Sequence, residues 1–196
     1  MRWIWPTAGG VAVLGVLFAI FITGGKSGTA ASSYRVGSPG IGQAAPDFSL
    51  PSTSGRPVSL ADYRGKSVLL YFQEGIGCEP CWTQMKDLEQ VPAQVQAAGI
   101  DQIVSITTQP VGVLAQKARD EGVSFPVLSD ESLSVSQAYT ANQYGMMGTS
   151  MDGHTFVLVG PDGTIRWRAD YGGAPKYTMY VAPSQLLAEL RAGRRG

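Results

Sequence analysis

Two cysteines separated by two residues are the side chains of this sequence best suited to chemistry. They lie in the segment Cys78-Glu79-Pro80-Cys81, which follows an apolar run at residues 68–72 and is expected to begin a helix. Backbone amides and the helix dipole at that position stabilise a thiolate at Cys78, and proline suits the first helical turn. With this spacing, Cys81 can attack a mixed disulfide formed at Cys78. The pair is therefore predicted to cycle between dithiol and disulfide, with Cys78 capturing and Cys81 resolving.

Two other interpretations of the cysteine pair are open. The pair could be half of a zinc site, but such a site needs two more ligands, and His154 is the only histidine in the chain. The pair could also be inert and buried, although its place between a strand and a helix argues against this. Redox activity is the interpretation that the spacing and position favour.

Two glutamates near the cysteines have predicted roles. Glu74 lies between the apolar run and Cys78, where its carboxylate could relay the proton of the resolving thiol or could simply be a solvated loop acid. Glu79, directly after Cys78, is expected to oppose thiolate formation and to make the pair a weaker oxidant. This favours reduction of disulfides in partner proteins.

The single histidine precedes a predicted core strand, in the run Gly153-His154-Thr155. His154 is expected near the cysteines, where it could tune a thiolate or bind a metal together with them. Copper is the metal considered, because thiolates and the thioethers of Met146, Met147, Met151 and Met179 are soft ligands for copper(I). Methionines more often serve packing, so no bound cofactor is the first expectation.

Alternating strands and helices are expected to position these residues. The patterns predict two hairpins, one of residues 48–50 and 58–60 and one of residues 155–159 and 165–168, and further strands at 68–72, 103–107 and 125–128. They predict helices from Pro80 to a break at Pro92, at 111–121 and at 133–139. A last helix is expected from Ser184, as its N-cap, to Arg191. This order predicts an α/β fold, with a central mixed sheet covered by helices on both faces.

The composition and the N-terminal segment indicate the class of protein and its expected location. The chain has 196 residues, 44% hydrophobic and 15% charged, with 15 basic and 15 acidic side chains, so it can bury a core and lacks the charge of a nucleic-acid binder. Residues 3–23 carry no charge and are long enough to cross a bilayer. We expect a transmembrane anchor or signal segment at 1–24, a flexible linker at 25–42, the folded domain at 43–192 and a basic tail at 193–196. The anchor predicts a single-pass protein of the cell membrane with its domain outside the cytoplasm.

Several segments together resemble a known family. They are Pro46 to Leu50, Val58 to Lys66, the strand at 68–72, the C-E-P-C segment, and residues 155–159 with the turn Pro161-Asp162-Gly163. The combination is similar to the redoxin group, which holds AhpC/TSA peroxiredoxins and membrane-tethered thioredoxin-like disulfide reductases. The resemblance implies a thioredoxin-like fold with an N-terminal hairpin extension. It also implies exported thiol or disulfide proteins as partners and an upstream thiol donor.

The chain departs from the patterns of these families in three places. Gly77 stands where thioredoxin-like members carry tryptophan, and Gly153 with His154 stands where they carry a cis-proline. Read against Cys81, Glu74 and Cys78 occupy the proline and threonine positions of peroxiredoxins, so peroxide reduction is expected to be slow or absent. The segment around His154 also resembles Sco-type copper chaperones, which leaves a copper chaperone or sensor using Cys78, Cys81 and His154 as an alternative.

Overall fold

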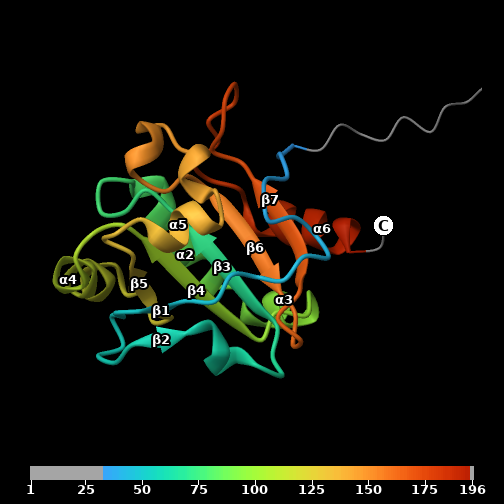
Figure 1. The fold of residues 1–196 in the computed structure, drawn as a ribbon, viewed down its shortest axis with the longest axis horizontal. Helices are drawn as coiled ribbons and strands as arrows, with labels where there is room; N and C mark the ends of the chain where they lie inside the picture. Colours follow the sequence, from blue (N-terminus) through green and yellow to red (C-terminus); the bar gives the residue numbers. More distant parts are fainter. Residues whose placement is uncertain (1–32, 195–196) are drawn as a thin grey trace, which may run out of the picture. The chain divides into compact units, whose positions relative to one another are not determined.

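A five-stranded mixed sheet forms the centre of the computed structural model, which describes residues 33–194 (Figure 1). Its strands, in the spatial order β5-β4-β3-β6-β7, are β3 Val68–Phe72, β4 Gln102–Thr107, β5 Val127–Ser129, β6 Thr155–Val159 and β7 Ile165–Asp170. Strands β3, β4 and β5 run parallel, whereas β6 is antiparallel to β3 and β7 is antiparallel to β6. All of β3 is buried, which explains its uninterrupted apolar sequence.

Four helices cover one face of the sheet. They are α2 Glu79–Glu89, α3 Pro92–Ala97, α4 Val111–Glu121 and α6 Pro183–Gly193. Their buried side chains share one core cluster with alternate strand residues, including Leu69 and Tyr71 of β3. Both cysteines belong to this cluster.

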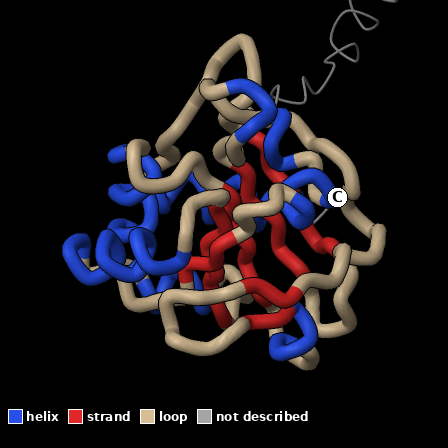
Figure 2. Tube along the Cα trace, turned by 60° about the vertical axis from the view of Figure 1, so that its left-hand side comes forward, coloured by secondary structure: helices blue, strands red, loops and turns tan. Residues whose placement is uncertain are grey.

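The second face is covered by shorter elements. These are the hairpin of β1 Ser49–Leu50 and β2 Val58–Ser59, the 3-10 helix η1 Leu60–Tyr63, and α5 Ser134–Ala138. They pack on the other set of strand residues, including Leu70 and Phe72. Figure 2 shows the strands as a central layer between these coverings. The predicted mixed sheet, the helices on both faces and the N-terminal hairpin are confirmed.

Several predicted element boundaries differ from the structure by one or two residues, and two of these differences have a local explanation. Strand β5 begins at Val127 rather than at residue 125, since Pro126 has no N–H to donate to a neighbouring strand. Helix α6 begins at Pro183 with Ala182 as its N-cap, so Ser184 lies inside the first turn and is not the cap. The expected break at Pro92 is present, because α2 ends at Glu89 and α3 begins at Pro92.

Residues 35–45, here called the N-terminal strap, lie against the outer edge of β7. Arg35 and Asp170 exchange two backbone hydrogen bonds, and the Ile165 N–H donates to the Gln43 carbonyl. The Asp170 carboxylate also accepts from the Gly37 N–H and is ion-paired with the buried Arg168 at 2.9 Å. The part of the expected linker 25–42 that the structure describes is therefore held on the domain.

The termini of the expected layout lie partly outside the described residues. No helix within residues 33–194 is long and apolar enough to cross a membrane, and the predicted span at 3–23 lies outside that range. Two additional 3-10 helices, η2 Ala141–Gln143 and η3 Gly148–Ser150, belong to the segment between α5 and β6. At the C-terminus, Gly193 closes α6, and Arg194 donates to the Ala98 carbonyl.

Candidate active site

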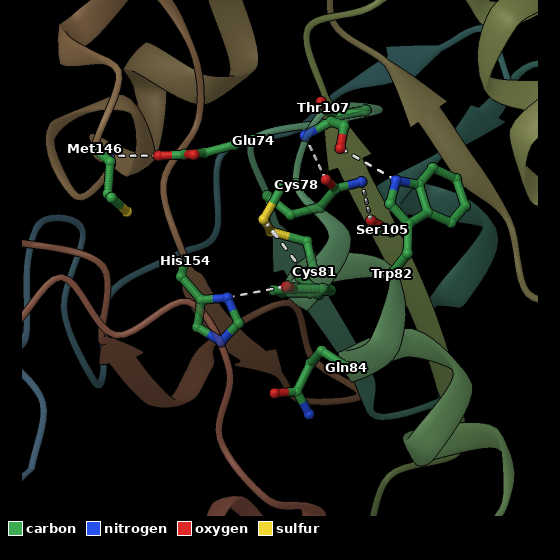
Figure 3. Close-up of a disulfide and its surroundings, with 12 residues drawn as sticks. Glu74, Cys78, Cys81, Trp82, Gln84, Ser105, Thr107, Met146 and His154 are labelled. Carbon is green, nitrogen blue, oxygen red and sulfur yellow. Dashed lines mark hydrogen bonds between the residues drawn. A yellow bond between two sulfur atoms is a disulfide. The ribbon is translucent and has the colours of Figure 1, made fainter.

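A disulfide between Cys78 and Cys81 lies at the N-terminus of α2 (Figure 3). The sharp loop after β3 places it there, and Gly75, at φ +91°, is the residue that permits this loop. A Cβ atom at Gly75 would lie 1.4 Å from the end of the Gln109 side chain, so a larger residue would have to displace that side chain as well as strain the backbone. Pro80 occupies the first turn of α2 as expected. The predicted position of the cysteine pair at a strand-to-helix turn is thus what the structure shows.

The two sulfur atoms differ in their surroundings. Cys78 is 8% exposed and caps the helix, with its Sγ 3.3 Å from the backbone nitrogen of Cys81, whose N–H it accepts. Cys81 is 0% exposed and lies one turn inside α2. An amide donor and the helix dipole both stabilise negative charge at the Cys78 sulfur. Only Cys78 is therefore placed to meet a partner at the surface.

Trp82, which sequence reasoning did not single out, supports the loop before the cysteines. Its indole N–H donates to the Gly75 carbonyl at 3.1 Å, and the ring is fully buried. The ammonium of Lys117 lies over the ring, 5.7 Å from its centre. The sequence offered one signal for this role, because Trp82 directly follows the second cysteine, whereas thioredoxin-like proteins carry a tryptophan before the first cysteine, where this chain has Gly77.

The expected effect of Glu79 on Cys78 is corrected by its ion pairs. Its carboxylate lies 3.8 Å from Lys86 and 3.5 Å from Lys117, and both lysines also bind Glu121 at 2.5 Å. Hydrogen bonds to Glu121 raise the pKa of each lysine, so both stay charged. Glu79 is exposed, but its negative charge is compensated locally. It therefore opposes a thiolate at Cys78 far less than an isolated carboxylate would.

Glu74 is buried rather than a solvated loop acid. It is 8% exposed, and its carboxylate accepts a hydrogen bond from the Met146 N–H at 2.5 Å. Gly145 makes this contact possible, because a Cβ atom there would lie 2.9 Å from the Glu74 carboxylate. Glu74 thus joins the cysteine loop to the segment between α5 and β6. Figure 3 shows its carboxylate directed toward Met146 and away from Cys81.

His154 lies beside the disulfide, at the start of β6 (Figure 3). It is fully buried, its Nδ1 lies 2.9 Å from the Tyr71 hydroxyl, and its Nε2 has no hydrogen-bond partner among residues 33–194. The aromatic rings of Tyr71, Phe156 and Tyr171 surround the imidazole at centroid distances of 5.1, 5.2 and 6.0 Å. Burial lowers the pKa of His154 to about 3, so the ring is neutral at physiological pH.

The two neighbours of His154 serve packing rather than the disulfide. Gly153 fits against the Tyr144 carbonyl oxygen, which would lie 1.7 Å from a Cβ atom. Thr155 donates its hydroxyl to Asp170, within the buried network that holds the N-terminal strap. Neither residue makes a polar contact with the cysteines. Their expected supporting role is therefore limited to positioning His154 and the start of β6.

The copper alternative, with Cys78, Cys81 and His154 as ligands, stays a prediction. Within residues 33–194, no three side chains of His, Cys, Asp or Glu are grouped closely enough to hold a metal ion. Met179 is buried in the core, whereas Met146 and Met147 are exposed. The described arrangement is an exchangeable sulfur pair beside a neutral, aromatic-lined imidazole.

Comparisons with known proteins agree with this chemistry. Residues 41–168 match the AhpC/TSA family. A protein of Mycobacterium tuberculosis with a peroxiredoxin name is 37% identical over 130 residues, which are 63% of this chain and 80% of that protein. The thiol-disulfide oxidoreductase ResA of Geobacillus thermodenitrificans is 33% identical over 99 residues, or 50% of this chain and 56% of ResA.

A solved structure gives the same fold. The crystal structure of peroxidoxin BcpB from Mycobacterium tuberculosis matches with a TM-score of 0.63 at 23% identity, and covers 78% of this chain and 96% of that one. At this level of identity the match shows the thioredoxin-like peroxiredoxin fold alone.

Proposed function

The chain belongs to the AhpC/TSA family, and we propose that it is a thiol-disulfide oxidoreductase that reduces disulfides in partner proteins. The observation that carries this proposal is the unequal placement of the two cysteines, with Cys78 at the helix N-terminus and Cys81 buried behind it. Family relatives named as a peroxiredoxin and as a thiol-disulfide oxidoreductase support the broader assignment to redox chemistry at cysteine.

The proposed reaction has two exchange steps. The Cys78 thiolate attacks one sulfur of a partner cystine, forms a mixed disulfide and releases the other partner sulfur as a thiolate. The Cys81 thiolate then attacks the Cys78 sulfur. The Cys78–Cys81 bond forms as the bond to the partner breaks, and the released partner thiolates take up protons. The partner gains two electrons, and an upstream dithiol donor must return two electrons to the pair.

Burial of Cys81 supports the proposed direction. Its thiol lies in an apolar cluster, where a thiolate is poorly stabilised. A dithiol whose reduced form is poorly stabilised gives up its electrons readily, so the pair favours the disulfide state. Glu79, whose charge is compensated by Lys86 and Lys117, adds little to this preference.

Trapping with single-cysteine variants tests the proposal. The protein carrying Cys81→Ser, incubated with insulin as a cystine substrate, is expected to form a stable mixed disulfide through Cys78. The matched variant Cys78→Ser is expected to capture nothing, since its remaining cysteine is fully buried. Trapping through Cys81 alone would reverse the roles and contradict the proposal. Capture with Cys81→Ser from the native compartment then identifies the partner.

Peroxide reduction is a second candidate because relatives carry peroxiredoxin names. The buried arginine of strands β6 and β7 is Arg168, which is paired with Asp170 and bound to Pro39 and Thr140. Its neighbours Trp167 and Ala169 share the cysteine cluster, so strand alternation directs Arg168 to the opposite face. We expect oxidation by hydrogen peroxide, followed by stopped-flow fluorescence, to be no faster than for a free cysteine thiolate. A much faster rate would assign the protein as a peroxidase.

The location of the protein is part of the proposal and rests on the sequence. The uncharged segment at residues 3–23 supports a single-pass anchor in the cell membrane with the domain outside the cytoplasm. Exported disulfide proteins would then be the partners. Alkaline extraction of membranes and N-terminal sequencing of the mature protein test this, and a mature N-terminus near Ala31 would remove the anchor.

A further inference from the structure

A buried tyrosine from the core cluster of the resolving cysteine is hydrogen-bonded to His154. The Tyr71 hydroxyl and His154 Nδ1 are hydrogen-bonded at 2.9 Å, and both residues are fully buried. Tyr71, on β3, and Cys81, on α2, belong to the same core cluster. Figure 3 shows His154, the partner of Tyr71 in this bond, beside the disulfide.

The protonation states of the pair are fixed by its surroundings. Burial raises the pKa of Tyr71 well above its ordinary value, and the nearby charge of Glu74 adds to this, so the phenol keeps its proton. His154 is neutral and carries one proton on its ring. The other titratable group facing the imidazole is Tyr171, whose hydroxyl donates to Glu189. No cation is therefore placed against Cys81 by these residues.

A neutral His154 can hold its proton on either nitrogen, and the two forms have different consequences. With the proton on Nε2, the Tyr71 hydroxyl donates to Nδ1, and the buried Nε2–H has no acceptor in the part of the chain that the structure describes. With the proton on Nδ1, the imidazole donates to the Tyr71 oxygen and the phenol proton is free to turn toward another acceptor. A negative sulfur at Cys81 supplies such an acceptor once the disulfide opens.

We propose that Tyr71, oriented by His154, donates a hydrogen bond to the Cys81 sulfur during the resolving step of disulfide exchange. This inference rests on the proposed function and deepens it. The Cys81 thiolate attacks Cys78, the intramolecular disulfide forms, and the partner thiolate leaves as described above. Tyr71 keeps its proton throughout, so its role is to stabilise the attacking sulfur. The hydrogen bond partly offsets the cost of a thiolate in the apolar cluster.

The expected effect is confined to one of the two steps. A hydrogen bond to a charged acceptor corresponds to about 1–2 pKa units. Loss of the phenol proton therefore raises the pKa of Cys81 by that amount. The smaller thiolate fraction is partly balanced by greater nucleophilicity, so resolution slows about 3- to 10-fold. Attack by Cys78 on the partner is unaffected.

Rapid-quench kinetics with oxidised glutathione separate the steps. Cys78 first forms a mixed disulfide with glutathione, and Cys81 then resolves it in a first-order step. Tyr71→Phe is expected to slow resolution and to move its pH profile upward by about 1–2 units, with the capture rate unchanged. His154→Phe, which keeps the phenol but leaves it unoriented, is expected to show a smaller change in the same direction.

Phe156→Leu is the control for packing. It removes a ring stacked on Tyr71 at 4.4 Å but leaves the hydroxyl and imidazole in place, so its pH profile should match the unaltered protein. The inference is overturned if Tyr71→Phe leaves the resolution profile unchanged, or if Phe156→Leu shifts it equally. Absence of any mixed disulfide at Cys78 would instead contradict the proposed function itself. The two failures are therefore distinguishable.

Discussion

Lys117 of α4 lies 3.5 Å from Glu79, the residue that directly follows Cys78. The same ammonium binds Glu121 of its own helix and lies over the Trp82 ring. Lys117 thus connects α4 to two residues of α2 that flank the cysteine pair, Glu79 and Trp82.

Removing this lysine is expected to weaken the Cys78 thiolate. Lys117→Gln leaves Glu79 with Lys86 alone, so the pKa of Cys78 rises, by less than about one unit because these charges face solvent. Glu79→Gln shifts it in the opposite direction. The pH dependence of Cys78 alkylation measures both. Arg119→Gln makes the same change of charge on α4 beside Gln116 and should leave the profile in place.

Gly153 tests the close packing that positions His154. Gly153→Ala places a Cβ atom on the Tyr144 carbonyl and is expected to lower the free energy of unfolding by at least about 2 kcal/mol. Gly112→Ala in α4, where a Cβ atom meets nothing, should raise stability by up to about 1 kcal/mol. Urea denaturation compares the two. Equal stabilities would show that the segment around Tyr144 moves freely.

Asp152 should make stability depend on pH. Its carboxylate is fully buried, and this burial raises its pKa well above the ordinary value. An acid with a raised folded pKa destabilises the fold progressively as pH rises above its unfolded pKa of about 4, until its folded pKa is passed. Asp152→Asn should therefore equal the unaltered protein in stability at low pH. Above pH 4 it should gain by about 1.4 kcal/mol per pH unit over that window.

The control for this prediction has the opposite sign. Hydrogen bonding by Thr164, aided by the charge of Arg166, lowers the pKa of Asp162. Asp162→Asn should therefore lose stability only above the folded pKa of Asp162. Thermal denaturation from pH 3 to 8 gives the stability of each variant relative to the unaltered protein. The same pH dependence for both variants would show that ionisation of Asp152 does not destabilise the fold.

Breaking the buried Arg168–Asp170 ion pair behind the N-terminal strap should cost more stability than breaking the exposed Arg166–Asp162 pair. Arg168→Met leaves Asp170 buried without its cation and is expected to destabilise the fold by about 3–5 kcal/mol. Arg166→Met breaks an exposed pair with Asp162 and should cost less than about 1 kcal/mol. Hydrogen exchange should also become faster in residues 35–45 for Arg168→Met only. Unchanged hydrogen exchange in residues 35–45 would show that the ion pair does not hold the N-terminal strap on the domain.

Local signals were sufficient for the framework of the site. The apolar run of β3, the proline in the first turn of α2 and the cysteine spacing all act over a few residues, and each is where the sequence predicted it. The α/β order followed from the same local periodicity.

Contacts between distant segments could not be predicted. Glu74 is buried because Met146 folds back onto it, and Glu79 is compensated by Lys117 of another helix. Tyr71 was indistinguishable from the rest of a core strand until His154 was placed against it. Arg35 belonged to an apparently featureless linker, and only its pairing with Asp170 reveals its place. Each of these depends on the tertiary arrangement rather than on neighbouring residues.

The N-terminal strap also has a consequence for self-association. Backbone groups at both ends of β7 are occupied by Arg35 and by residues 42–45. At the opposite edge, residues 51–53 pair with β5 through the Ser52–Leu128 bridge. A second molecule could extend the sheet only by displacing these segments and their hydrogen bonds. Edge-to-edge strand addition, the usual route by which sheets merge into larger aggregates, is thereby obstructed on both sides.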